Sequence, residues 1–127
     1  MIRCMTMRLS LIAAAVLLPA AGPSYAAGDA EAGKIVFKKC AICHNVEPGK
    51  NKIGPSLFGV VGRESATAPD FNYSETMKNL KRQWTPEELD TYLSEPRKLV
   101  PGTKMIFPGL KDDTERQNVI AYLETLK

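Results

Sequence analysis

The 127-residue sequence contains one histidine, three cysteines and one tryptophan, and these small numbers limit the sites that it can build. Its one long apolar run lies at the N-terminus, which excludes a protein with several membrane-spanning helices. No segment alternates apolar and polar residues as a β-strand does. The 44% hydrophobic and 24% charged residues are typical of a globular protein and exclude disordered, collagen-like and coiled-coil chains. The sequence therefore predicts a single all-α domain.

The first 26 residues have the pattern of a secretory signal peptide. Residues 1–8 are basic, an apolar run follows, and small residues precede a cleavage site after Ala26. The apolar run is about ten residues long, well short of the ~20 that cross a bilayer, which argues against an uncleaved membrane anchor. Cys4 precedes this run, the wrong side for a lipid anchor. We therefore expect a cleaved signal at residues 1–26, one domain at residues 27–127, and export to the bacterial periplasm.

The chain expected after cleavage is nearly neutral. Residues 1–26 include Arg3, Arg8 and Cys4 but no acidic residue, so their removal lowers the formal charge from +3 to near +1 and leaves two cysteines. A nucleic-acid-binding domain is usually strongly basic, so a nucleic-acid partner is excluded. The remaining 101 residues are also few for a core made of protein alone.

The two remaining cysteines and the only histidine are neighbours in Cys40-Ala41-Ile42-Cys43-His44. A thioredoxin-like motif opens a helix after a strand, whereas the segment before Cys40 has a helical pattern. A structural zinc ion needs four ligands, and a disulfide here closes a loop too short to stabilise the fold much. Cys-x-x-Cys-His is the signature of c-type haem attachment. The motif therefore predicts one haem c bound through Cys40 and Cys43, with the His44 imidazole beneath the iron.

The presence of a single histidine also limits which residue can be the sixth ligand of the iron. Because His44 is the only histidine, the ligand is a methionine or a lysine, or the position is open. Met77 lies in a short polar stretch that resembles a helical turn, and Met105 lies in a loop with two prolines and two glycines. A stiff loop loses less entropy on ordering, which favours Met105 over Met77. His/Met ligation raises the iron potential and leaves no open position for a substrate, which favours electron transfer over catalysis.

Helical periodicity and capping signals occur in three stretches: residues 29–41, residues 86–95, and the stretch from residue 112 onward. The second helix must end before Pro96, because the residue before a proline disfavours helical geometry. Residues 45–69 have no periodicity and are expected to form loops. We expect the N- and C-terminal helices to pack together, with Gly33 and Tyr122 allowing a close approach.

Together these motifs resemble the class I c-type cytochromes, close to the cytochrome c2 and mitochondrial cytochrome c branch. The resemblance runs from Gly28 to Lys127 and includes Gly54-Pro55, Gly62-Arg63, Pro69 through Tyr73, Trp84, Tyr92-Leu93, Pro96, residues 101–107, Thr114-Glu115-Arg116 and Ile120 through Leu123. It implies a small helical fold wrapped around one haem and an electron-transfer protein that is not an enzyme.

The resemblance also implies roles for individual residues. His44 is the proximal ligand and Met105 the distal one, and the Pro55 carbonyl accepts a hydrogen bond from the His44 ring. Tyr92 lies near the Met105 sulfur. The residues expected to hold or approach the haem propionates are Arg63, Tyr73, Trp84 and Thr103. Met77 departs from the mitochondrial pattern, which has an asparagine near the buried propionate.

Basic residues match the ring that surrounds the exposed haem edge in this family. They are Lys39, Lys52, Arg97, Lys98, Lys104 and Lys111. Because the net charge after cleavage is near +1, acidic residues elsewhere balance such a ring, and a dipole orients docking. The alternative is that these are simply solvated charges.

Two functions follow from these expectations. The first is a soluble, monomeric one-electron carrier without a stable membrane anchor, which forms transient complexes with respiratory, photosynthetic or dehydrogenase partners. The second is a haem enzyme or gas sensor with an open iron site, such as a peroxidase-like protein. The second needs a distal acid–base group, and the sequence has no second histidine to supply one.

Overall fold

A computed structural model describes residues 27–127, and the expected signal peptide lies outside the described residues. The helices of this part of the chain are α1 (Ala30–Val36), α2 (Lys38–Ala41), α3 (Glu75–Leu80), α4 (Pro86–Ser94), α5 (Pro96–Leu99) and α6 (Asp113–Glu124). Between residues 27 and 127 the β-type pairing is one isolated bridge, from Glu64 to Gln83. The predicted all-α fold is confirmed.

The first predicted helix is present but interrupted at Phe37. The Asp29 carboxylate caps α1 by accepting hydrogen bonds from the Glu31 and Ala32 amides at 2.8 and 3.1 Å. Phe37 keeps helical dihedral angles, and its carbonyl accepts a bond from the Cys40 amide at 2.8 Å. A bond between residues three positions apart is typical of a 3₁₀ turn, which is wound more tightly than an α-helix. The interruption separates α1 from α2, which carries Cys40.

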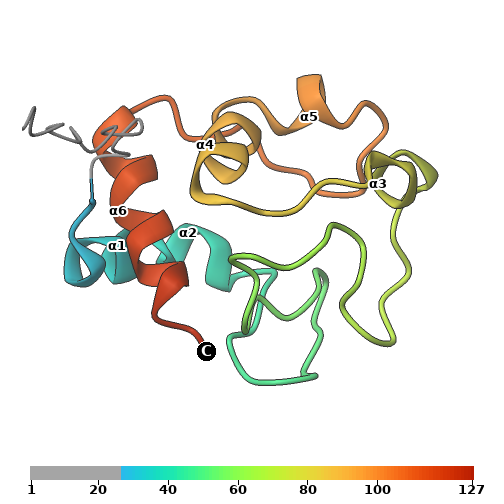
Figure 1. Cartoon of the computed structure of the whole chain (residues 1–127), viewed down its shortest axis with the longest axis horizontal. Helices are drawn as coiled ribbons and strands as arrows, with labels where there is room; N and C mark the ends of the chain where they lie inside the picture. The colour runs from blue at the N-terminus through green and yellow to red at the C-terminus, as the bar shows by residue number, and fades with distance from the viewer. Residues whose placement is uncertain (1–26) are drawn as a thin grey trace, which may run out of the picture.

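The N- and C-terminal helices cross at one end of the molecule, and α3 lies toward the other (Figure 1). At the crossing, a Cβ atom added to Gly33 would lie 1.9 Å from the Asn118 carbonyl oxygen and 2.9 Å from the Tyr122 Cβ. Only glycine allows this approach. The Phe37 and Tyr122 rings pack beside it with centroids 5.1 Å apart. The expected packing of these helices is therefore confirmed.

The second predicted helix ends where expected, but the chain resumes a helix immediately. The Thr85 side chain caps α4 by accepting a hydrogen bond from the Glu88 amide at 3.2 Å. After α4 ends at Ser94, Pro96 begins the single turn α5, a helix that the sequence pattern does not predict. Proline suits the first position of a helix, because the amide that it lacks has no partner there.

Side-chain hydrogen bonds and scattered backbone bonds, and not a regular ladder, hold the long loop between α2 and α3. The Asn51 side chain bonds the Pro69 carbonyl at 2.9 Å and the Ser56 amide at 2.9 Å. The Gly59 amide donates to the Leu126 carbonyl at 2.6 Å, which ties the loop to the C-terminal end of the chain. Within residues 27–127, every helix is too short or too polar to cross a membrane.

Candidate functional site

A cavity of about 380 Å³ lies among the long loop, α4 and the segment before α6. Both ends of the chain reach it, since Phe37 lines it from the N-terminal side, and Val119 and Leu123 line it from α6. The walls are mainly apolar. The cavity is lined by every residue to which the sequence analysis assigned a cofactor role: Cys40, Cys43, His44, Pro55, Arg63, Tyr73, Trp84, Tyr92, Thr103 and Met105.

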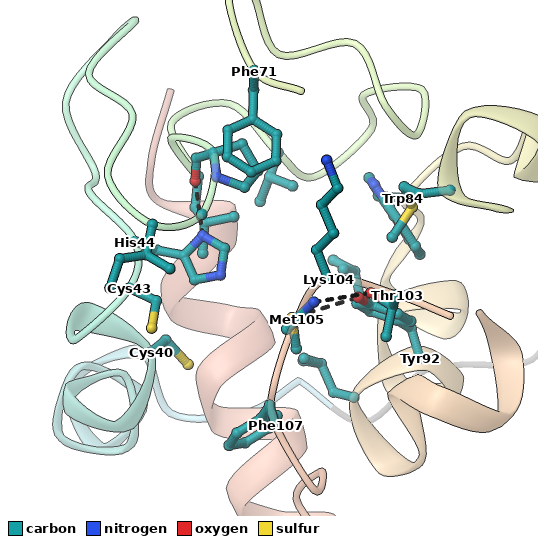
Figure 2. A pocket seen from close by; sticks show the side chains of 18 of the residues that line it. Cys40, Cys43, His44, Phe71, Trp84, Tyr92, Thr103, Lys104, Met105 and Phe107 are labelled. Atoms are coloured by element: carbon teal, nitrogen blue, oxygen red, sulfur yellow. Dashed lines mark hydrogen bonds between the residues drawn. The ribbon is translucent and has the colours of Figure 1, made fainter. Parts of the chain in front are cut away.

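The two cysteines lie at one edge of this cavity, and neither forms a disulfide. The Cys43 and His44 amides both donate to the Cys40 carbonyl, at 3.0 and 2.9 Å. This turn places both thiols and the imidazole beside the same space (Figure 2). Burial raises the pKa of the Cys40 thiol to about 11. The motif thus forms a local structural unit and does not require a distant segment to assemble it.

The His44 ring is oriented by a backbone carbonyl. Its Nδ1 lies 2.8 Å from the Pro55 oxygen, and because a carbonyl only accepts, Nδ1 is the donor and Nε2 keeps its lone pair. Burial lowers the pKa of His44, which favours the neutral ring that can bind a metal. Gly54 packs against the ring so closely that an added Cβ would lie 2.4 Å from His44 Cε1.

Met105 faces His44 across the open centre of the cavity (Figure 2). The Tyr92 hydroxyl donates to the Met105 sulfur at 3.4 Å, and the Met105 amide donates to the Thr103 hydroxyl at 3.2 Å. The Tyr92 ring packs against Trp84 at a tilt of 38°, with ring centroids 4.9 Å apart. Met77 is also buried against the cavity, on α3.

A guanidinium with an unsatisfied donor lies at another wall. Arg63 donates to the Phe58 and Ser56 carbonyls at 3.0 and 3.2 Å, while its Nε is buried without a hydrogen-bond partner. The Tyr73 hydroxyl accepts a hydrogen bond from the Ala68 amide at 3.2 Å. Since a buried donor without a partner is costly, Arg63 is suited to an acidic group placed in the cavity.

The described residues fit a covalently held haem c. The cavity presents two unpaired thiols, a neutral imidazole with an available nitrogen, a thioether opposite it, and an unsatisfied guanidinium donor for a carboxylate. The apolar walls suit the porphyrin plane. Sequence reasoning missed two aromatic wall residues, Phe71 and Phe107. Both lie within stretches that carry the resemblance, residues 69–73 and 101–107, but the sequence did not indicate that their side chains face the cavity.

The predicted basic ring is dispersed and partly neutralised. Lys39 and Lys104 line the cavity, whereas Arg97, Lys98 and Lys111 surround a separate depression with Glu95. Lys39 lies 2.8 Å from both carboxylate oxygens of Glu115 on α6. The other lysines of the set also have partners: Lys52 the Ala41 carbonyl, Lys98 the Glu95 carboxylate, Lys104 the Asn72 carbonyl and Lys111 the Ser94 carbonyl.

Comparisons with known proteins agree with this geometry. A family profile described as cytochrome c matches residues 30–127. Cytochrome c2 of Rhodopila globiformis is 50% identical over 101 residues, which make up 79% of this chain and 95% of that protein. Cytochrome c-type cyt cy of Rhodobacter capsulatus is 53% identical over 105 residues, 82% of this chain, and the chain spans about half of its length (52%).

The fold has a solved counterpart as well. Cytochrome cH from Methylobacterium extorquens matches with a TM-score of 0.74 at 43% sequence identity, over 77% of this chain and 99% of that one. A small helical domain with this site and these relatives is a class I c-type cytochrome. The chain belongs to the cytochrome c family. As a member it carries one haem c, attached through Cys40 and Cys43, and it is an electron-transfer protein and not an enzyme.

Proposed function

We propose that this protein is a soluble, exported one-electron carrier whose haem iron is bound by His44 and Met105. The observation that carries the proposal is the Met105 thioether facing the His44 ring across the cavity (Figure 2). The bound haem supplies an iron that cycles between Fe(III) and Fe(II). Because His44 and Met105 would both bind that iron, the chain would leave no position on it open for a substrate.

The chain's own groups adjust the stability of the two iron states. The Pro55 carbonyl accepts the Nδ1 proton of His44, which makes Nε2 a stronger donor. The Tyr92 hydroxyl donates to the Met105 sulfur, which draws electron density away from the thioether. Buried apolar residues around them, such as Leu89 and Leu93, exclude water. A soft thioether in an apolar site favours the less charged ferrous state, so we expect a clearly positive reduction potential.

The proposed location rests on residues 1–26, and the proposed partners rest on the basic residues near the cavity. Residues 1–26 act as a cleaved signal peptide that brings the chain to the periplasm, where haem attachment keeps the cofactor on the protein. The partners are membrane or soluble redox proteins, including those of a respiratory chain. They dock transiently near the cavity mouth, since redox encounters use small interfaces. Basic residues at the cavity, Lys39 and Lys104, orient acidic partners, and this attraction weakens as the salt concentration rises.

The axial ligand is tested by paired methionine substitutions. In ferric protein purified after export, Met105→Leu abolishes the sulfur-to-iron charge-transfer absorption band, and Met77→Leu preserves it. Mass spectrometry of the same samples reports the covalent haem and the cleavage site. Loss of the band from Met77→Leu alone would overturn the ligand assignment. Rapid binding of carbon monoxide to the native ferrous protein would instead support the haem enzyme or gas sensor.

A further inference from the structure

The segment that carries Met105 has little backbone support of its own. Among the described residues, no backbone-to-backbone hydrogen bond involves residues 104–109. The Met105 amide bonds only the Thr103 side chain, and Ile106 beside it is 88% exposed. Two side-chain contacts lie inside the segment, from the Tyr92 hydroxyl to the Met105 sulfur and from Lys104 to the Asn72 carbonyl. The backbone around Met105 therefore depends on how the two ends of residues 100–110 are held.

The N-terminal end is held by the element that precedes it. Val100 is fully buried, and its amide donates to the Pro96 carbonyl at 2.9 Å. The Thr103 amide then donates to the Val100 carbonyl at 3.1 Å. These contacts are local in sequence, since each joins residues three or four positions apart.

The C-terminal end is held by contacts with two helices, α4 and α6. The Leu110 amide donates to the Leu93 carbonyl on α4 at 2.8 Å, and Leu110 is almost fully buried. Its carbonyl accepts a 2.8 Å bond from Arg116 on α6. Both backbone groups of Leu110 are thus bound, one to each of two helices.

Arg116 reaches three parts of the chain from a buried position. Its residue exposure is 8%. Its Nε donates to Asp90 on α4 at 2.8 Å, and its terminal nitrogens donate to the Leu110 and Lys111 carbonyls at 2.8 and 3.2 Å and to the Asp113 carboxylate. Guanidinium is suited to this arrangement, because its five donors lie in a fixed plane.

We propose that Arg116 is a positioning residue for Met105. By bonding both Asp90 on α4 and the carbonyl of Leu110, it fixes the C-terminal end of the segment relative to α4. Two residues beyond Asp90, α4 presents Tyr92, whose hydroxyl bonds the Met105 sulfur. The same guanidinium thus aligns the segment that carries the thioether and the helix that carries its hydrogen-bond donor. This inference rests on the proposed ligation by Met105.

An external ligand measures this role directly. Imidazole binds the ferric iron only after Met105 has moved away, so its apparent affinity reports the fraction of molecules with the segment displaced. In Arg116→Gln holoprotein we expect imidazole affinity to increase about tenfold, because hydrogen bonds to a charged group are lost. Arg116→Lys keeps the charge but cannot reach Asp90 and both carbonyls together, so it increases the affinity as well.

A matched control removes an arginine that does not touch the segment. Arg82, which precedes α4, forms an exposed ion pair at 3.0 Å with Glu88, a residue of the helix that also carries Asp90. Arg82→Gln leaves imidazole affinity unchanged. If Arg116→Gln does not accumulate as holoprotein, Asp90→Asn tests the same link from α4 and increases the affinity less.

The outcomes separate the two proposals. Lower global stability by far-ultraviolet circular dichroism with unchanged imidazole affinity would show that Arg116 only stabilises α6, and would overturn the inference. Wild-type affinity in Arg116→Lys would overturn it too, since charge alone would then suffice. Absence of the charge-transfer band from the wild-type ferric protein would instead refute Met105 ligation itself.

Discussion

The two sides of the cavity are built in different ways. On the His44 side, a single turn of chain presents both thiols and the imidazole, and a carbonyl only 11 residues away orients the ring. On the Met105 side, no backbone-to-backbone hydrogen bond of residues 27–127 involves residues 104–109, and contacts with α4 and α6 hold the end of the segment. The His44 side therefore depends on local sequence, and the Met105 side depends on packing between distant elements. We therefore expect substitutions on one side of the cavity to leave the other side largely intact.

The largest effect is expected from Gly54→Ala, on the His44 side. The added Cβ would lie 2.4 Å from His44 Cε1, and moving the ring away would break its 2.8 Å hydrogen bond to the Pro55 carbonyl. We expect a loss of about 3 kcal/mol in the free energy of unfolding. Chemical denaturation followed by circular dichroism measures it.

Gly49→Ala is the control for this substitution. Gly49 has a φ of +68° but nothing within 4 Å of an added Cβ, so alanine there costs only roughly 1 kcal/mol. Equal losses from the two variants would mean that contact with His44 is unimportant.

The next effect is expected from Gly109→Ala, on the Met105 side. Its Cβ would lie 2.3 Å from the Ser94 carbonyl oxygen, and its φ is +99°. We expect the charge-transfer band to disappear at lower denaturant concentration, by the equivalent of about 2 kcal/mol, while helix content persists. Gly102→Ala, also at positive φ (+74°) but with its nearest neighbour 3.9 Å away, serves as the control. Simultaneous loss of band and helix in Gly109→Ala would contradict the proposed independence of this side.

A smaller effect is expected from Tyr92→Phe, which removes the 3.4 Å bond to the Met105 sulfur. Without this donor the sulfur releases more electron density to the iron and stabilises the ferric state. The reduction potential should fall by about 40 mV, the equivalent of about 1 kcal/mol. Tyr122→Phe, at the crossing of α1 and α6, leaves the potential unchanged. A rise in the potential of Tyr92→Phe would reverse the assigned role of the hydroxyl.

The smallest effect concerns the charges at the cavity. Lys39 is paired with Glu115, whereas Lys104 bonds only a backbone carbonyl. Oxidation by anionic ferricyanide at low salt should slow about twofold in Lys104→Gln and less in Lys39→Gln. Stopped-flow rates at several ionic strengths measure this difference. A larger effect at Lys39 would mean that its pair with Glu115 opens in solution.

Much of the site could be predicted because it depends on short stretches of sequence. The haem motif, the Thr85 cap of α4 and the close approach at Gly33 each depend on a few adjacent residues or on the absence of a side chain. The break at Phe37 and the extra turn at Pro96 were missed, since both patterns are compatible with a continuous helix or a loop.

The charged residues were the least predictable part. Lys39 and Glu115 are separated by 76 positions, and the sequence does not indicate that they form a pair. Arg116 lies in a stretch of charged residues that resembles an exposed helix start, yet it is buried among Asp90 and two carbonyls.

The sequence alone determined the cofactor, its attachment through Cys40 and Cys43, and the helical class of this protein, because covalent chemistry and helix caps depend on neighbouring residues. Only the tertiary structure decided which charges are neutralised and what holds the segment around Met105 in place. Those features arise where residues far apart in the chain meet, and the free energy of such contacts depends on burial and geometry that no local pattern records.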